Sequence, residues 1–256
     1  MDLDSVATRA GVRHVAHETT ASTNADALAL ARRGELGPLW VTARMQSAGR
    51  GRRGREWISR PGNLFATLLL VDPCPPECAP QLSFVAALAV HDAVIETATA
   101  LGPHLALKWP NDVLCDGAKL AGILIEGEGT ATVSVAVGIG VNCAQHPEGT
   151  EYPSTDLASA GVVVAPETLF RALSRVMLTR LAQWNRGDGF AAIRADWMAR
   201  AAGLGRPIRV RLGDRAVDGS FEALDPVGRL LLRRADGAVE TIAAGDVFPL
   251  VTAAES

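Results

Sequence analysis

The chain has 256 residues, 48% hydrophobic and 21% charged, a composition typical of a soluble globular protein with one substantial core and room for a small second domain. The formal net charge of −3 argues against a nucleic-acid-binding surface that is basic overall. The acidic N-terminus MDLDSVATRAG lacks the apolar core of a signal peptide, and runs such as LSFVAALAV are too short to span a bilayer. We therefore expect a cytoplasmic protein that does not enter a membrane.

The four cysteines show no CxxC spacing, and no HxxxH pair is present, so no metal site is predicted and free thiols are expected.

Helix-type and strand-type segments alternate over the first two hundred residues. A helix at 23–33 is expected to begin at the N-cap candidates Ser22 or Thr23 and to end at Gly34. Strands are expected at 40–44, 64–71, 105–109, 122–126 and 132–141, and a long helix at 81–101. Two further helices are expected between 166 and 202. This alternation indicates an α/β domain.

The pattern changes after Gly205. PIRVRL, SFEAL, RLLLRR and AVETIA are short β-type segments, and Asp236-Gly237 is a hairpin signal. The sequence therefore predicts two domains, residues 1–204 and a small β-barrel at 205–256. Only 21 residues precede Ser22, too few for a helix-turn-helix domain.

The segment QSAGRGRRGREW, residues 46–57, carries most of the local positive charge. From Arg44 to Arg60 there are six arginines against one acid, Glu56. Glycines let the backbone approach a ligand, and arginines supply charge and paired donors, so the segment suits a small anion. It matches neither GxxxxGK[ST] nor GxGxxG, and a flexible basic surface loop remains the alternative.

Two further motifs follow on predicted strands. In KWPND, residues 108–112, Asn111 and Asp112 suit a turn at a strand end, or they face a cleft as acceptors. In KLAGILIE, residues 119–126, Lys119 is either a solvated strand-edge lysine or a fixed ammonium group. Gly122 lets a ligand or another backbone pass close to the strand.

GIGVN, residues 138–142, and STN, residues 22–24, are weak signals by themselves. GIGVN ends a β run with two glycines and an amide. STN is a helix N-cap, which is compatible with a ligand site because helix N-termini present unpaired N–H donors.

The order of these motifs resembles the biotin–protein ligases over almost the whole chain. The resemblance implies a mixed β-sheet flanked by helices, related to class II aminoacyl-tRNA synthetases, followed by an SH3-like barrel. It also implies the reaction: ATP activates biotin to biotinyl-5′-AMP, and a lysine of a biotin carboxyl carrier domain then accepts the biotinyl group. Mg²⁺ would arrive with the nucleotide. The best-known bacterial members carry an N-terminal DNA-binding domain, for which this chain has no room before Ser22, so we interpret it as a ligase-only form, a monomer or homodimer that binds no nucleic acid.

The resemblance also assigns roles to individual residues. Lys119 and Arg50 would be catalytic, with Lys119 beside the biotin carboxylate and the α-phosphate. The predicted biotin-binding residues are Ser22, Thr23, Asn24, Gln46, Arg50, Gly51, Arg52, Lys119 and Gly122. The predicted nucleotide-binding residues are Arg52, Trp57, Asn111 and Asn142. Arg53 and Arg55 are expected to be solvated.

Two rival functions remain. A lipoyl ligase or octanoyltransferase would use the same scaffold. A nucleic-acid-binding module would use the arginine segment, but one Tyr and six Phe offer few stacking platforms.

Overall fold

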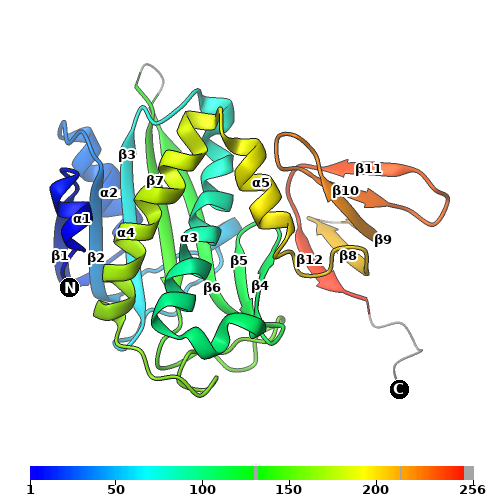
Figure 1. The fold of residues 1–256 in the computed structure, drawn as a ribbon, viewed down its shortest axis with the longest axis horizontal. Helices are drawn as coiled ribbons and strands as arrows, with labels where there is room; N and C mark the ends of the chain where they lie inside the picture. The colour runs from blue at the N-terminus through cyan, green and yellow to red at the C-terminus, as the bar shows by residue number, and fades with distance from the viewer. Residues whose placement is uncertain (130–131, 214, 251–256) are drawn as a thin grey trace.

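The first domain is built on a mixed seven-stranded sheet. Figure 1 shows the computed structural model, which describes residues 1–129, 132–213 and 215–250. The strand order is β1-β2-β3-β7-β6-β5-β4, with β1 and β2 parallel and every other neighbouring pair antiparallel. The strands are β1 (Arg13–Thr20), β2 (Leu39–Gln46), β3 (Leu64–Val71), β4 (Leu105–Lys108), β5 (Asp112–Cys115), β6 (Ala118–Glu128) and β7 (Ser134–Val141). The mixed sheet implied by the resemblance is confirmed.

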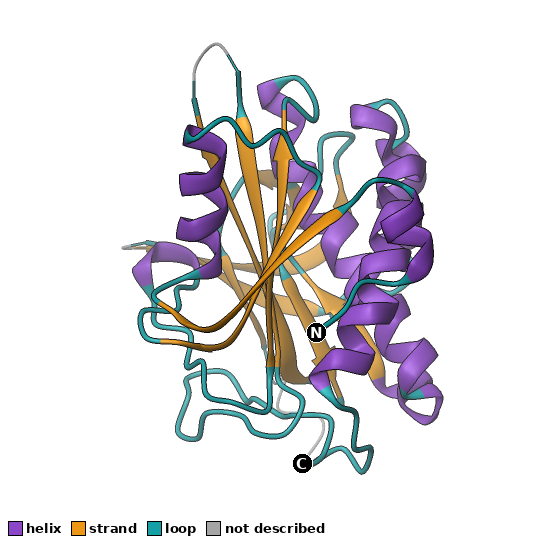
Figure 2. Ribbon diagram, turned by 90° about the vertical axis from the view of Figure 1, so that its left-hand side faces the viewer, coloured by secondary structure: helices purple, strands orange, loops and turns teal. Residues whose placement is uncertain are grey.

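Helices cover both faces of this sheet (Figure 2). They are α1 (Ser5–Arg9), α2 (Thr23–Arg32), α3 (Leu82–Thr97), α4 (Pro166–Trp184) and α5 (Phe190–Met198). On one face, α2 packs Ala27 against Leu39, Val41 and Leu69. On the opposite face, α3 and α4 pack side by side, with α3 over β4 to β7 and α4 over β3, and both helices belong to the main hydrophobic core.

Helix α3 is buried almost all round, which explains its apolar sequence. Together with the turn of 3₁₀-helix before it, it forms a helical run, Pro76–Thr97, that has the length and composition of a membrane span. That run is longer than the uninterrupted apolar segments visible in the sequence. Most of it is buried inside the protein, against the sheet, α4 and α5, as expected for the core helix of a soluble domain.

A second, five-stranded antiparallel sheet forms the C-terminal domain. Its strands are β8 (Pro207–Leu212), β9 (Arg215–Leu224), β10 (Leu230–Arg233), β11 (Val239–Ile242) and β12 (Asp246–Pro249), in the order β11-β10-β9-β8-β12. The architecture is consistent with the expected SH3-like fold. The predicted Asp236-Gly237 hairpin joins β10 to β11, and Gly237 takes the positive φ of 86° that this turn requires.

The C-terminal domain is docked against β4, α3 and α5 (Figure 1). Trp109 Nε1 donates a hydrogen bond to the carbonyl of Gly228 at 3.0 Å. Arg194 donates to the carbonyl of Leu224 at 2.6 Å. On the first-domain side, Phe84 packs edge-on against Trp197, with ring centroids 5.5 Å apart. These contacts place the first residue of β12 near the arginine segment.

The elements differ from the sequence prediction in several places, of which one shifted helix end and two unpredicted strands are the most informative. The helix expected at 81–101 ends at Thr97, where Ala98 leaves the helical region and a 3₁₀ segment carries the chain on to His104. Strand β1 was not predicted, because this edge strand alternates too weakly in polarity to be recognised. Strand β5 was not predicted because Asp112, taken for a turn residue, begins the second strand of a tight hairpin.

Candidate active site

A pocket of about 460 Å³ opens on the α2 side of the first sheet. Its wall comes from α2, the arginine segment, strands β4 to β7, the loop at 144–156 and the start of β12. The structure brings all the predicted site residues to this one pocket: Ser22, Thr23, Asn24, Gln46, Arg50, Gly51, Arg52, Trp57, Asn111, Lys119, Gly122 and Asn142. The roles assigned to them remain predictions.

Glycines on the two central strands form the floor of the pocket. In β7, the side chains of Val137, Ile139 and Val141 point into the main core, so the alternate positions Gly138 and Gly140 face the pocket. Gly140 pairs across the sheet with Gly122 of β6. The GIGVN pattern is therefore a strand with bulky side chains on its core face and none on its pocket face, where the side chains of Asn24 and Trp57 lie against the glycines.

One end of the pocket is a buried network of polar side chains. Thr23 donates its backbone N–H to Gln46 Oε1 at 2.9 Å. Asn24 Nδ2 donates to Glu126 Oε2 at 2.8 Å, and Asn24 Oδ1 accepts from Thr67 Oγ1 at 2.6 Å. Because Thr23, Asn24 and Thr67 are almost fully buried, these bonds fix the direction of each donor and acceptor before a ligand arrives.

Ser22 lies next to this network, at the start of α2. It is the N-cap, and its side chain accepts from the backbone N–H of Ala25. The N-cap reading and the binding-site reading of STN are therefore both compatible with the structure. The helix begins at the wall of the pocket, so its N-terminal N–H donors lie beside the space for a ligand.

Trp57 lies directly on the glycine floor. A Cβ atom added to Gly140 would lie 2.5 Å from Trp57 Nε1, and one added to Gly122 would lie 3.0 Å from Trp57 Cζ3. The indole Nε1 is buried and has no hydrogen-bond partner among the described residues. The indole can rest there only because neither strand carries a side chain at these positions.

A carboxylate flanked by two lysines lies at the other end. Asp112 Oδ1 is 2.7 Å from Lys119 Nζ, and Asp112 Oδ2 is 3.5 Å from Lys108 Nζ. Lys108 also lies over the ring of Tyr152, 3.5 Å from its centroid. Burial lowers the pKa of Lys108 from its usual value, and the charge of Asp112 offsets part of that effect. With two cations and one anion, this end of the pocket attracts anions.

The loop at 144–156 closes the pocket beside Lys119. Its first turn is held by Asn63 Oδ1, which accepts from the backbone N–H groups of Cys143 at 2.9 Å and Ala144 at 3.0 Å. Its far end meets β6, where Lys119 donates its backbone N–H to Pro153 at 2.7 Å. Lys119 is therefore fixed through both its backbone and its ammonium group, rather than solvated.

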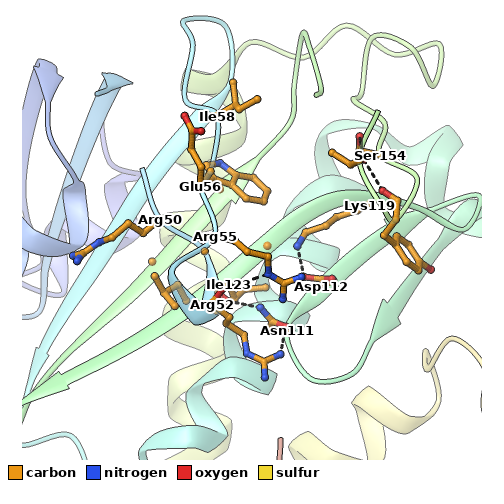
Figure 3. Close-up of a pocket in the computed structure, with 18 of the residues that line it drawn as sticks. Arg50, Arg52, Arg55, Glu56, Ile58, Asn111, Asp112, Lys119, Ile123 and Ser154 are labelled. Carbon is orange, nitrogen blue, oxygen red and sulfur yellow. Dashed lines mark hydrogen bonds and ion pairs between the residues drawn. The ribbon is translucent and has the colours of Figure 1, made fainter. Parts of the chain in front are cut away.

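The arginine segment is folded over the pocket and is held by side chains of both domains (Figure 3). Arg52 Nη1 donates to Asn111 Oδ1 at 3.2 Å and to the carbonyl of Gly245 at 3.3 Å. Arg53 and Arg55 both pair with Asp246, at 3.2 and 2.8 Å. The expectation that Arg53 and Arg55 are simply solvated is wrong, because a carboxylate about 190 positions away in sequence lies beside them.

Arg50 behaves differently from its neighbours. Its guanidinium group is about half exposed, lies 3.6 Å from Glu126 and points away from Lys119 and Asp112 (Figure 3). In this structure Arg50 thus lies at the polar end of the pocket, beside the carboxylate that also binds Asn24. Its catalytic role stays a prediction.

Several lining residues were not selected from the sequence. Lys108 belongs to the KWPND motif, so its place in a recognised motif was the available signal. Tyr152, Asp246 and Phe248 belong to no motif: the fold of the loop at 144–156 brings Tyr152 to the pocket, and the docking of the C-terminal domain brings Asp246 and Phe248. Within the described part of the chain, no cluster of three or more His, Cys, Asp or Glu side chains is arranged to hold a metal ion.

The mixed sheet and its glycine-floored, cation-rich pocket are those of a class of ligases, and two family matches in the sequence identify this class. Residues 18–142 match the Biotin/lipoate A/B protein ligase family, and residues 203–248 match the Biotin protein ligase C terminal domain. Relatives narrow the class further. The biotin--[acetyl-CoA-carboxylase] ligase of Paracoccus denitrificans is 47% identical over 239 residues, which cover 90% of this chain and 97% of that protein. The chain belongs to the biotin protein ligase family.

Solved structures agree with this assignment. The biotin protein ligase from Aquifex aeolicus in complex with biotin and ATP superimposes with a TM-score of 0.77 at 25% identity, covering 92% of this chain and 97% of that one. The biotin protein ligase from Leishmania major in complex with biotinyl-5-AMP gives 0.63 at 26% identity, covering 91% and 99%. The bifunctional ligase/repressor of Bacillus subtilis is 32% identical, and the match covers 93% of this chain and 74% of that protein.

Proposed function

We propose that this chain activates biotin with ATP to form biotinyl-5′-AMP and transfers the biotinyl group to one lysine of a biotin carboxyl carrier domain. The observation that carries the proposal is a single pocket with a preorganised polar end and a cation-rich end, separated by a glycine floor. Biotin has the matching shape, with a neutral ureido ring at one end and a carboxylate at the other.

The polar end suits the ureido ring. The ring offers one carbonyl acceptor and two N–H donors, and the network around Thr23, Asn24 and Gln46 presents both kinds of partner in fixed directions. The valeryl chain would then run past the Trp57 indole, which covers the floor at Gly122 and Gly140. This orientation leads the carboxylate toward Lys119.

The first step joins two anions, so a fixed positive field is its main requirement. A biotin carboxylate oxygen attacks the α-phosphorus of ATP, the bond to the bridging oxygen of the β-phosphate breaks, and pyrophosphate leaves. Lys119 stands beside both reacting groups, and Arg52 faces the phosphates. Mg²⁺ accompanies the nucleotide and shields its charge; the lysines around Asp112 suit phosphate oxygens better than a metal held by the protein.

The second step transfers the activated acyl group. The neutral ε-amine of the carrier lysine attacks the carbonyl carbon of the mixed anhydride, the bond to the AMP oxygen breaks, and the amine loses one proton. AMP leaves as a phosphate monoester beside the same cations.

A reducing, cytoplasmic setting agrees with the cysteines. All four are free, and burial raises the pKa of Cys74 to about 11 and of Cys143 to about 12. Such thiols are poor nucleophiles and do not compete for the activated acyl group.

Biotin-dependent pyrophosphate–ATP exchange tests the first step. We expect exchange with biotin and none with lipoate or octanoate. Exchange with lipoate alone would contradict the proposal and would identify the chain as a lipoyl ligase. Against the nucleic-acid alternative, Arg52, Arg53 and Arg55 are paired with Asn111 and Asp246 of the same chain, and the exposed part of Arg53 and Arg55 is small for a nucleic-acid surface.

A further inference from the structure

Three arginines of the pocket loop converge on one carboxylate of the other domain. Asp246 lies 2.8 Å from Arg55, 3.2 Å from Arg53 and 3.9 Å from Arg52. The Asp246 side chain is 14% exposed, so it is a partly desolvated counter-ion and not a freely hydrated surface group. These contacts run from the first residue of β12 to the segment that covers the pocket.

The backbone beside Asp246 takes part in the same contact. Arg52 donates to the carbonyl of Gly245 at 3.3 Å. A Cβ atom on Gly245 would lie 2.6 Å from Val210, so glycine lets the chain pass close to β8 at this point. Asp246 in turn pairs in register with Arg211 of β8, so its position is set by the second sheet.

The charges do not cancel. Three guanidinium groups against one carboxylate leave an excess of two positive charges at the pocket wall. Asp246 therefore gathers the loop without neutralising it, and the remaining charge still faces the pocket, where phosphates would lie. A fully matched set of carboxylates would have held the loop equally well but removed its attraction for an anion.

We propose that Asp246 is a positioning residue that holds the arginine loop closed over the pocket, so that the activated acyl group stays bound until the carrier lysine arrives. The loop's ligand contacts belong to the proposed function, on which this inference rests. The inference adds that closure depends on a carboxylate of the C-terminal domain, which makes that domain part of the adenylation site.

Limited proteolysis tests the closure without any turnover. Trypsin cleaves after arginine, so the loop contains cleavage sites of its own. Cleavage after Arg52 and Arg53 is measured by mass spectrometry. We expect Asp246→Asn to be cleaved there roughly five- to tenfold faster than the parent, as expected for losing a small network of partly exposed ion pairs. The matched control is Asp218→Asn, which breaks an arginine–carboxylate pair of the same domain, with Arg209. It should be cleaved like the parent.

Retention of the adenylate gives the second measurement. Each variant is loaded with biotin, Mg²⁺ and ATP, and labelling of a lysine-rich bystander protein reports escaped adenylate. The chain competes little as an acceptor, because only Lys108 and Lys119 among its 25 basic residues are lysines, and both lie in the pocket. We expect bystander labelling to rise roughly five- to tenfold in Asp246→Asn, while Asp218→Asn should label the bystander like the parent.

Two further variants keep the test decisive. Asp246→Glu retains the carboxylate and should restore protection of the loop. Arg55→Gln removes the ion pair with the shortest distance to Asp246. Because Arg55 is the more exposed partner, this variant should fold normally. It should be cleaved, and should label the bystander, like Asp246→Asn. Parent-like cleavage and labelling in both Asp246→Asn and Arg55→Gln would overturn the inference. A parent chain with no biotin-dependent exchange would contradict the proposed function instead, and the proteolysis comparison would still decide the role of Asp246.

Discussion

Lys119 Nζ lies 2.7 Å from Asp112 Oδ1, a contact between two neighbouring strands that directs the ammonium group into the pocket. Its position depends on a partner that is itself held in place, since Asp112 also contacts Lys108. In the proposed reaction, this fixed cation would lie where the carboxylate and the α-phosphate approach each other.

Replacing this cation should slow the adenylation step. Lys119→Ala is expected to fold normally and to lower kcat for pyrophosphate exchange roughly 10²–10³-fold, the usual cost of one preorganised electrostatic contact. Arg209→Ala, at a surface ion pair of the C-terminal domain, is the control and should keep the parent rate. Unchanged exchange in Lys119→Ala would remove this residue from the mechanism.

The polar end can be tested by deleting one hydroxyl group. Thr67 is fully buried, and its Oγ1 bonds to Asn24 Oδ1 at 2.6 Å and to Thr23 Oγ1 at 2.8 Å. Thr67→Val leaves both partners less well satisfied, which should cost about 1–3 kcal/mol of stability and raise the KM for biotin about tenfold. Denaturant unfolding and exchange kinetics measure the two effects.

Thr42→Val provides the matched control for that measurement. Thr42 is also a buried sheet threonine, but its hydroxyl bonds to His14, away from the pocket. It should lose stability without a change in the KM for biotin. An equal rise of KM in both variants would mean that the Thr67 effect is a general consequence of destabilisation.

The glycine floor predicts a steric effect. Gly140→Ala places a Cβ atom 2.5 Å from Trp57 Nε1, so the indole must leave its position. Trp57 is only partly buried, whereas Trp40, Trp184 and Trp197 lie in the core, so a change in tryptophan fluorescence would report mainly on Trp57.

The added Cβ should also narrow the channel for the biotin chain. We expect the KM for biotin to rise about tenfold or more, corresponding to about 1–3 kcal/mol of overpacking. Gly127→Ala on β6 is the control, because its Cβ would meet only ordinary contact at 4.0 Å. A parent-like spectrum and KM in Gly140→Ala would show that the floor does not limit the pocket.

The pocket loop also predicts a pH effect on stability. Asp156 is buried and accepts hydrogen bonds from the backbone N–H of Ser159 at 2.7 Å and from His146 at 2.5 Å. Burial alone would raise the pKa of Asp156, but these bonds lower it overall. The stabilisation is therefore present above the unfolded-state pKa, near 3.8, and is lost as the pH falls through the folded-state value.

Asp156→Asn should accordingly be less stable than the parent at pH 7, by about 1–3 kcal/mol. Urea unfolding at several pH values should show that difference shrinking as the pH falls below about 4, where the carboxylate of the unfolded chain takes up a proton before that of the folded chain does. A difference that stays constant down to pH 3 would mean that Asp156 contributes through shape rather than charge.

Most of the pocket was predictable because its residues lie in contiguous motifs. Gly122, Lys119 and Asn111 occur on or beside strands, where local alternation decides which face a residue occupies. The floor of the site thus follows from a period of two in β6 and β7. The central strand 64–71 was predicted at its observed bounds for the related reason that it is apolar on both faces.

The parts that were not predicted depend on contacts between distant segments. Nothing near Asp246 in the sequence marks it as a partner of Arg55, because their distance depends on how the second sheet docks through Trp109 and Gly228. Tyr152 is likewise recognisable only after the loop at 144–156 has been folded over Lys108. Local patterns predict faces and turns, whereas these pairings arise from tertiary packing.

The central claim is that this pocket biotinylates a carrier lysine, and the intact mass of the carrier measures this most directly. A biotin carboxyl carrier domain is incubated with the chain, biotin, ATP and Mg²⁺, with each component omitted in turn. The account predicts one biotinyl group on one lysine, present only when biotin and ATP are both supplied. A carrier domain that stays unmodified, while a lipoyl domain gains a lipoyl group under the same conditions with lipoate, would contradict it.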